Sequence, residues 1–120
     1  MFNWKDYLDL ALFLHGNDKI TYTEEAAHRA AISRAYYAAF CYTRNYAHDH
    51  SSFEPTGSAK DHGLLKAHYR KRGHYDIVNY LDELRQWRNN CDYDNEIEGD
   101  LSQRVQYAID DAEYIINEIK

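Results

Sequence analysis

The sequence predicts an all-α protein, an antiparallel, up-and-down bundle of four to five helices. Apolar residues recur at helical spacing along most of the chain, and no alternating strand pattern is bounded by turn residues. The single proline, Pro55, lies in the one convincing internal loop, HDHSSFEPTGSAKD. A chain of 120 residues is expected to form one domain, 1–120, around one core.

The first two expected helices precede this loop. The first covers roughly 2–15 and stops at Gly16, and its apolar contacts are expected from Trp4, Leu8, Ala11, Leu12 and Leu14. The second covers roughly 23–48, with either Thr21 and Glu24 together or Thr23 alone as its N-terminal cap. It is rich in alanine, which lets a neighbouring helix approach closely.

The third and fourth helices follow the loop. The third is expected at roughly 58–72, with Ser58 as its cap and Gly73 as its stop. The fourth is expected at roughly 74–90. One face of it is apolar, comprising Ile77, Val78, Leu81, Leu84 and Trp87.

The last helix is expected at roughly 100–119. Asp100 and Gln103 resemble a capping box at its start. Its apolar residues form a heptad-like seam, comprising Leu101, Val105, Ala108, Ala112, Ile115 and Ile119. A seam of this length packs inside a bundle more often than it forms a free coiled coil.

Charge and composition limit the function classes. The formal net charge of -6 argues against a broad electrostatic grip on nucleic acid, although a local basic patch remains open. There are 12 tyrosines against 4 phenylalanines, and tyrosine suits interfaces and half-wet clefts. Without a signal peptide or a membrane-length apolar run, we expect a cytoplasmic protein with reduced thiols and no membrane partner.

No cofactor and no metal are expected. Cys41 and Cys91 have no metal-type spacing, and His62 and His68 are too far apart to bind one ion from one helix face. Glycine-rich phosphate loops and nucleophile elbows are missing from the sequence. The RKR run at 70–72 is interpreted as helix C-terminal cations in preference to a phosphate patch.

Arg34 lies among small and aromatic residues in AAISRAYYAAF and is expected to be at least partly buried. A buried arginine needs a carboxylate or carbonyl partner. It is either a structural ion pair or a cation held beside a cleft.

The segment LRQWRNNCDYDNE contains a second cluster. If the fourth helix continues one turn, Arg88 pairs with Asp92 and Asn89 with Tyr93, each at i and i+4. A surface ion pair of this kind contributes about 0.3–0.5 kcal/mol. Arginine also binds phosphate bidentately and asparagine can orient it, so phosphodiester chemistry can also use such a cluster.

Three segments together resemble the HEPN domain, named for higher eukaryotes and prokaryotes nucleotide-binding. They are SRAYYAAF, HGLLKAHYRKRG and LDELRQWRNNCDYD, and the similarity spans roughly 7–114. The resemblance implies a helical bundle that pairs as a homodimer. It also implies a toxin–antitoxin setting, often beside a small nucleotidyltransferase, or an anti-phage defence system. Many members are metal-independent endoribonucleases whose arginine and nearby histidine assemble across the dimer.

Carried over to this chain, Arg88 matches the arginine and Asn89 the polar residue after it. The position of the histidine falls on Tyr93, or on Asp94 if the gap is longer. Free tyrosine has a pKa near 10, so it is a poor base at neutral pH compared with imidazole. The resemblance thus implies a catalytic set of Arg88, Asn89, Asp92 and Tyr93, and RNA or nucleotide binding by Arg34, Arg88 and Asn89.

Three hypotheses follow. The first is a dimeric HEPN-like module that binds RNA or a nucleotide around Arg88 and Asn89, with Tyr93 in place of histidine. The second is an active metal-independent endoribonuclease toxin with a variant Arg-Asn-x-x-Asp-Tyr site. The third is a structural adaptor for a partner nucleotidyltransferase. The missing histidine favours binding over cleavage, and whether the chain is an enzyme stays open.

Overall fold

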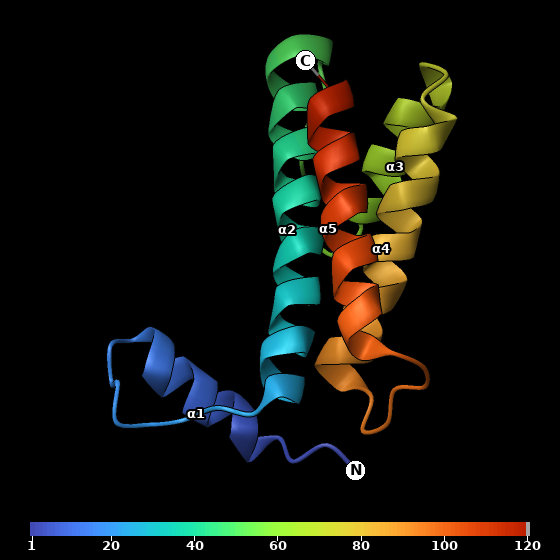
Figure 1. The fold of residues 1–120 in the computed structure, drawn as a ribbon. Helices are drawn as coiled ribbons and strands as arrows, with labels where there is room; N and C mark the ends of the chain where they lie inside the picture. Colours follow the sequence, from blue (N-terminus) through green and yellow to red (C-terminus); the bar gives the residue numbers. More distant parts are fainter. Residues whose placement is uncertain (120) are drawn as a thin grey trace.

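The protein is an all-α helical bundle (Figure 1), as the sequence predicts. The computed structural model describes residues 1–119, and every regular element in this range is an α-helix. The helices are α1 (Lys5–Leu14), α2 (Glu24–Ser51), α3 (Asp61–Lys71), α4 (Tyr75–Tyr93) and α5 (Leu101–Glu118). Each described helix is too short or too polar to cross a membrane.

α2 is the central scaffold, and it packs against both α4 and α5. α4 runs antiparallel to these two helices, whereas α2 and α5 run in the same direction because segment 52–60 turns back along the bundle before α3 (Figure 1). Thr23 alone caps α2, since its hydroxyl accepts the Ala26 amide at 3.2 Å. Ala26 and Ala39 of α2 are fully buried.

The main core lies between α2, α3, α4 and α5. Its fully buried aliphatic residues are Ile32, Leu65, Ile77, Leu81, Leu84 and Ile115. The predicted apolar face of α4 and the predicted seam of α5 both contribute to this core, so both predictions are confirmed. Asp100 accepts the Gln103 amide at 3.2 Å, which confirms the cap of α5.

The start of α3 differs from the prediction, because Ser58 is not its cap and the helix begins at Asp61. The Asp61 carboxylate accepts the backbone amides of Thr56 and Gly57, both at 2.9 Å, and so closes the preceding loop. The hydrogen bonds from Thr56 lower the pKa of Asp61. Gly73 ends α3 at a φ of 80°, as predicted.

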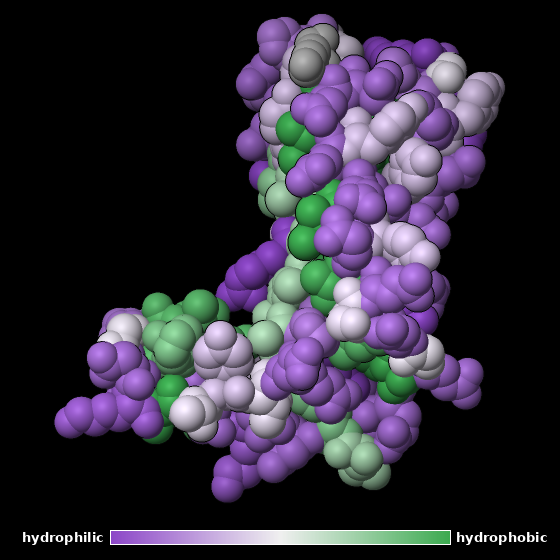
Figure 2. Space-filling view, in the orientation of Figure 1, coloured by the Kyte–Doolittle hydropathy of each residue, from purple (hydrophilic) through white to green (hydrophobic). Residues whose placement is uncertain are grey.

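α1 lies apart from the bundle and packs mainly against one end of α2 (Figure 1), and its Tyr7 hydroxyl also donates to the Cys91 carbonyl of α4 at 3.1 Å. Its sole buried residue is Leu10, within a small cluster that includes Phe2 and Ala26. Trp4 packs against this cluster, as predicted, but Leu8, Ala11, Leu12 and Leu14 are exposed, so the apolar contacts predicted for them are wrong. A helix packed mainly against one neighbour buries a narrow stripe, and Figure 2 shows the remaining hydrophobic side chains gathered over α1.

Candidate functional site

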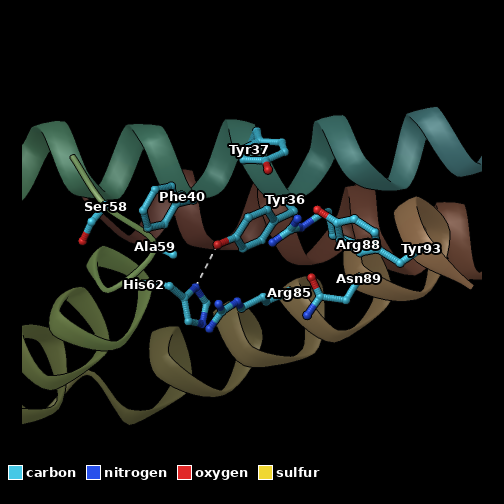
Figure 3. Close-up of a pocket in the computed structure, with 10 residues that line it drawn as sticks. All are labelled: Tyr36, Tyr37, Phe40, Ser58, Ala59, His62, Arg85, Arg88, Asn89 and Tyr93. Atoms are coloured by element: carbon cyan, nitrogen blue, oxygen red, sulfur yellow. Dashed lines mark hydrogen bonds between the residues drawn. The ribbon is translucent and has the colours of Figure 1, made fainter.

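A pocket of about 460 Å³ opens between α2, α4 and the start of α3 (Figure 3). We call it the arginine pocket. It is lined by Tyr36, Tyr37, Phe40, Ser58, Ala59, His62, Arg85, Arg88, Asn89 and Tyr93. Its volume lies within the range of about 300–1,000 Å³ that is typical of small-molecule sites.

α4 supplies the polar floor of this pocket. The helix extends to Tyr93 and not only to 90, so the cluster noted in the sequence is helical. Arg85, Asn89 and Tyr93 then lie on successive turns of one face, with Arg88 beside them. α2 supplies an aromatic wall on the opposite side, where Tyr36 and Phe40 stack at 5.7 Å.

Arg88 is held by contacts on several sides. Its Nη1 lies 3.7 Å from Asp92 Oδ2, which confirms the predicted i, i+4 pair. Asp92 also accepts the Ser33 hydroxyl at 3.3 Å and so links α2 to α4. The guanidinium carbon lies 5.3 Å from the Tyr36 ring and 5.4 Å from the Tyr37 ring, within cation–π range.

Two guanidinium groups in this pocket have unmet donors. The Nε atoms of Arg85 and Arg88 are buried and have no hydrogen-bond partner within residues 1–119. In the same range, no carboxylate lies within ion-pair distance of Arg85, and the only one near Arg88 is Asp92. Arg85 and Arg88 therefore bring two guanidinium groups to the pocket, and of the two only Arg88 has a carboxylate partner within residues 1–119.

His62 reaches the pocket from α3 and is the functional candidate that sequence reasoning missed. Its Nδ1 lies 2.9 Å from the Tyr36 hydroxyl, and its Nε2 lies 3.4 Å from Asp82 Oδ1. Burial lowers the pKa of His62 to about 4, although Asp82 opposes the shift, so the ring is neutral at pH 7. The sequence offers no signal for this contact, because it depends on how α3 packs against α2.

Asp82 completes a chain of polar contacts. Lys66 Nζ lies 2.6 Å from its carboxylate. Burial opposes the ionisation of Asp82, but hydrogen bonds from Lys66 and His62 outweigh it and lower the pKa of this carboxyl group. The Asp82 carboxylate therefore accepts from a neutral His62, and the Tyr36 hydroxyl donates to the other ring nitrogen.

The structure brings together three of the residues singled out in the sequence, because Arg88, Asn89 and Tyr93 all line the arginine pocket. Asp92 supports Arg88 from behind and faces a separate cavity of about 210 Å³ between α1 and α2. Arg34 lines that second cavity and not the arginine pocket. The predicted site residues are therefore divided between two cavities. Arg88, Asn89 and Tyr93 line the arginine pocket, whereas Arg34 and Asp92 line the second cavity.

The expected burial of Arg34 is wrong, because its side chain is exposed. The buried arginine of α2 is Arg29, which is 0% exposed. It donates to the carbonyls of Cys91 and Asp94, at 3.0 and 2.7 Å. α1 and the end of α4 cover this part of α2, whereas position 34 faces the open corner beside α1.

Other polar clusters have structural roles. Arg72 donates to the carbonyls of His68 and Ser51, both at 3.1 Å, which agrees with the helix C-terminal interpretation of the RKR run. His68 contacts the Ser51 hydroxyl at 2.8 Å. Over residues 1–119, no group of three or more histidine, cysteine or acidic side chains is arranged to hold a metal ion.

No protein-family model, no curated protein and no solved structure matches this chain. The resemblance to the HEPN domain thus stays a prediction based on sequence segments. Two of those segments contribute Tyr36 and Arg88 to the arginine pocket, and the third contributes His62.

Proposed function

We propose that this chain is a HEPN-like helical domain that binds RNA or a nucleotide in the arginine pocket. The observation that carries the proposal is that Arg85 and Arg88 both line this pocket, while no carboxylate within residues 1–119 lies at ion-pair distance from Arg85. Phosphate is a suitable acceptor because guanidinium groups bind it bidentately and with charge assistance.

The local charge supports an anionic ligand. The carboxylate of Asp92 lies 3.7 Å from the guanidinium group of Arg88 and offsets its charge. The carboxylate of Asp82 is paired with Lys66 at 2.6 Å. Arg85 therefore keeps an uncompensated positive charge at the pocket. The overall charge of -6 disfavours tight, sequence-independent binding of a polyanion away from the pocket.

The test is a binding titration with labelled single-stranded RNA and with a mononucleotide. Arg88→Gln should weaken binding of either ligand roughly 10- to 100-fold, the size of a lost hydrogen bond to a charged group. Arg70→Gln is the matched control, because Arg70 is an exposed arginine on α3 outside the pocket. Equal affinities for wild type and Arg88→Gln would exclude this pocket as the site.

An active endoribonuclease is the second candidate, and the neutral imidazole of His62 beside Tyr36 favours it. In this reaction the RNA 2′-oxygen attacks the adjacent phosphorus, the bond to the 5′-oxygen breaks, and a cyclic phosphate and a 5′-hydroxyl remain. A base must take the 2′-proton. Both ring nitrogens of His62 are engaged, by Tyr36 and Asp82, so the observed arrangement favours binding.

Cleavage is tested by incubating RNA with the purified protein and analysing the ends. Cyclic phosphate ends that disappear in both Arg88→Gln and His62→Gln would establish the nuclease and replace the binding proposal. Intact RNA under conditions in which it binds would leave the chain a binding module.

We further propose that two copies pair, and that the chain acts in a toxin–antitoxin or anti-phage setting, with a small nucleotidyltransferase as a partner. The setting rests on the resemblance to the HEPN domain. The pairing also has a physical basis in the corner between α1 and α2, where Phe13, Leu14 and Tyr22 leave apolar surface exposed. A nucleotidyltransferase gene beside this one would support the setting, and a complex that forms without any RNA or nucleotide binding would favour the adaptor role.

A further inference from the structure

Two exposed tyrosines, Tyr37 and Tyr93, line the arginine pocket. Tyr37 is 45% exposed and Tyr93 is 71% exposed, so both rings keep surface that a ligand can cover. Figure 3 shows Tyr37 on α2 and Tyr93 at the C-terminal end of α4, with Arg88 nearby. Aromatic side chains in such positions offer flat faces for stacking.

The floor of the pocket has a chemical order. Arg85, Asn89 and Tyr93 follow one another at intervals of one helical turn, which places about 12 Å along the helix axis between the first and the last. The order is a cation, then an amide, then an aromatic ring. A nucleotide has phosphate, sugar and base in the corresponding order.

Arg88 links the cationic part of the pocket, at Arg85, to the aromatic rings of Tyr37 and Tyr93. Its guanidinium lies 5.4 Å from the Tyr37 ring, while its buried Nε has no partner within residues 1–119. A phosphate bound at Arg85 and Arg88 therefore leaves the attached base next to Tyr37 and Tyr93. A bare phosphate needs the arginines but makes no use of the aromatic rings.

We propose that Tyr37 and Tyr93 form a stacking site for a nucleobase whose phosphate is bound by Arg85 and Arg88. This inference rests on the proposed function and names the part of the ligand that gives selectivity. The ligand is then an unpaired base on a phosphate, either in a mononucleotide or in a single strand. A base stacked in a duplex has no free face for these rings.

The experiment compares ligands with and without bases. The probes are a short oligoadenylate containing 2-aminopurine, a ribose-phosphate chain of the same length without bases, adenosine monophosphate and ribose 5-phosphate. In each pair the ligand with the base should bind roughly 5- to 150-fold more tightly, the effect typical of stacking one base on an aromatic side chain. If the ligand with the base binds more tightly in both pairs, the site accepts mononucleotides and single strands alike. If it binds more tightly only in the oligonucleotide pair, the ligand is a single strand.

Three variants identify the rings involved. Tyr93→Leu should reduce the advantage of the base and leave binding of the abasic chain unchanged, and Tyr93→Phe should keep that advantage. Tyr37→Leu should reduce the advantage of the base too, and it should also weaken binding of the abasic chain, because Tyr37 contacts Arg88. Tyr75→Leu is the matched control, because Tyr75 lies on the same helix, is 62% exposed and is outside the pocket. All these side chains are exposed, so the fold should persist.

The outcomes separate the two proposals. If abasic and base-bearing ligands bind equally and both need Arg88, the pocket binds phosphate and the stacking site is wrong. An advantage that survives both leucine variants would also overturn the stacking site, because the base would then lie elsewhere. If no ligand binds the wild-type protein, the proposed function fails as well.

Discussion

Arg29 and Arg34 lie on the same helix and have opposite environments. Arg29 is fully buried, with its guanidinium 4.1 Å from the Phe2 ring and hydrogen bonds to backbone carbonyls near the end of α4. Arg34 is exposed. At the scale of single residues, sequence context did not tell them apart, because both lie among alanines.

Replacement of Arg29 should therefore destabilise the protein. We expect Arg29→Met to lower the free energy of unfolding by about 2–4 kcal/mol, because several carbonyls lose their donor. Arg34→Met should change it by no more than about 0.5 kcal/mol. Urea denaturation of both variants measures the difference, and equal losses would show that Arg29 does not hold the end of α4.

His62 predicts a dependence of stability on pH. Its pKa is about 4 in the folded protein and near 6.5 in an unfolded chain. Above pH 6.5 the His62 ring is mostly neutral in both the folded and the unfolded state. As the pH falls towards 4 only the unfolded state takes up the proton, so this contribution to stability is lost with a limiting slope of about 1.4 kcal/mol per pH unit.

The measurement is a series of urea denaturation curves from pH 7 to pH 4. His62→Gln can still contact Tyr36 through its amide, and its stability should fall less steeply over this interval than that of the wild type. Parallel profiles for the two proteins would mean that His62 titrates normally in the folded state.

At the scale of elements, two carboxyl groups lie close together between α4 and α5, those of Glu83 and Asp111. Burial and the neighbouring Glu83 raise the pKa of Asp111 to about 8, and its Oδ2 is buried without a partner in the described chain. The folded state thus holds a proton that the unfolded state releases near pH 4. This contribution to stability is lost as the pH rises from about 4 to about 8.

Asp111→Asn should therefore stabilise the protein at pH 8. The gain should be on the order of 1 kcal/mol, since the site is partly exposed and solvent screens the repulsion. Thermal denaturation of the variant and the wild type at pH 8 and pH 5 measures it. The gain should shrink at the lower pH, and a gain of equal size at both would point to a cause other than this proton.

Much of each helix follows from its own sequence, whereas contacts between helices do not. The apolar face of α4 and the Thr23 cap of α2 depend on local spacing and were predictable. His62 lines the arginine pocket without a local signal, whereas Arg85 lies one helical turn before Asn89 and could have been found from that spacing. Arg88 and Tyr93 were singled out from helical spacing, the resemblance to the HEPN domain gave them roles, and both line the arginine pocket.

At the scale of the whole molecule, α1 leaves an open corner against α2 that suits a second copy. Leu14 is 60% exposed there. We expect a dimer at micromolar concentration and expect Leu14→Glu to shift it to monomer, because a charge in an apolar interface is costly. Leu64→Glu is the control, because Leu64 is 45% exposed on α3, away from this corner.

Sedimentation equilibrium measures the association. A wild-type monomer at micromolar concentration would contradict pairing altogether. A dimer that persists in Leu14→Glu would show that another face forms the interface.

The central claim is that the guanidinium groups of Arg85 and Arg88 bind a phosphate. NMR of the arginine Nε–H groups during titration with a nucleotide tests it most directly. Arg29 is an internal control, because its Nε is also buried without a partner in residues 1–119 but lies away from the pocket. We predict saturable shifts for Arg85 and Arg88 and none for Arg29. Unchanged signals for Arg85 and Arg88 at saturating nucleotide and at saturating single-stranded RNA would contradict the account.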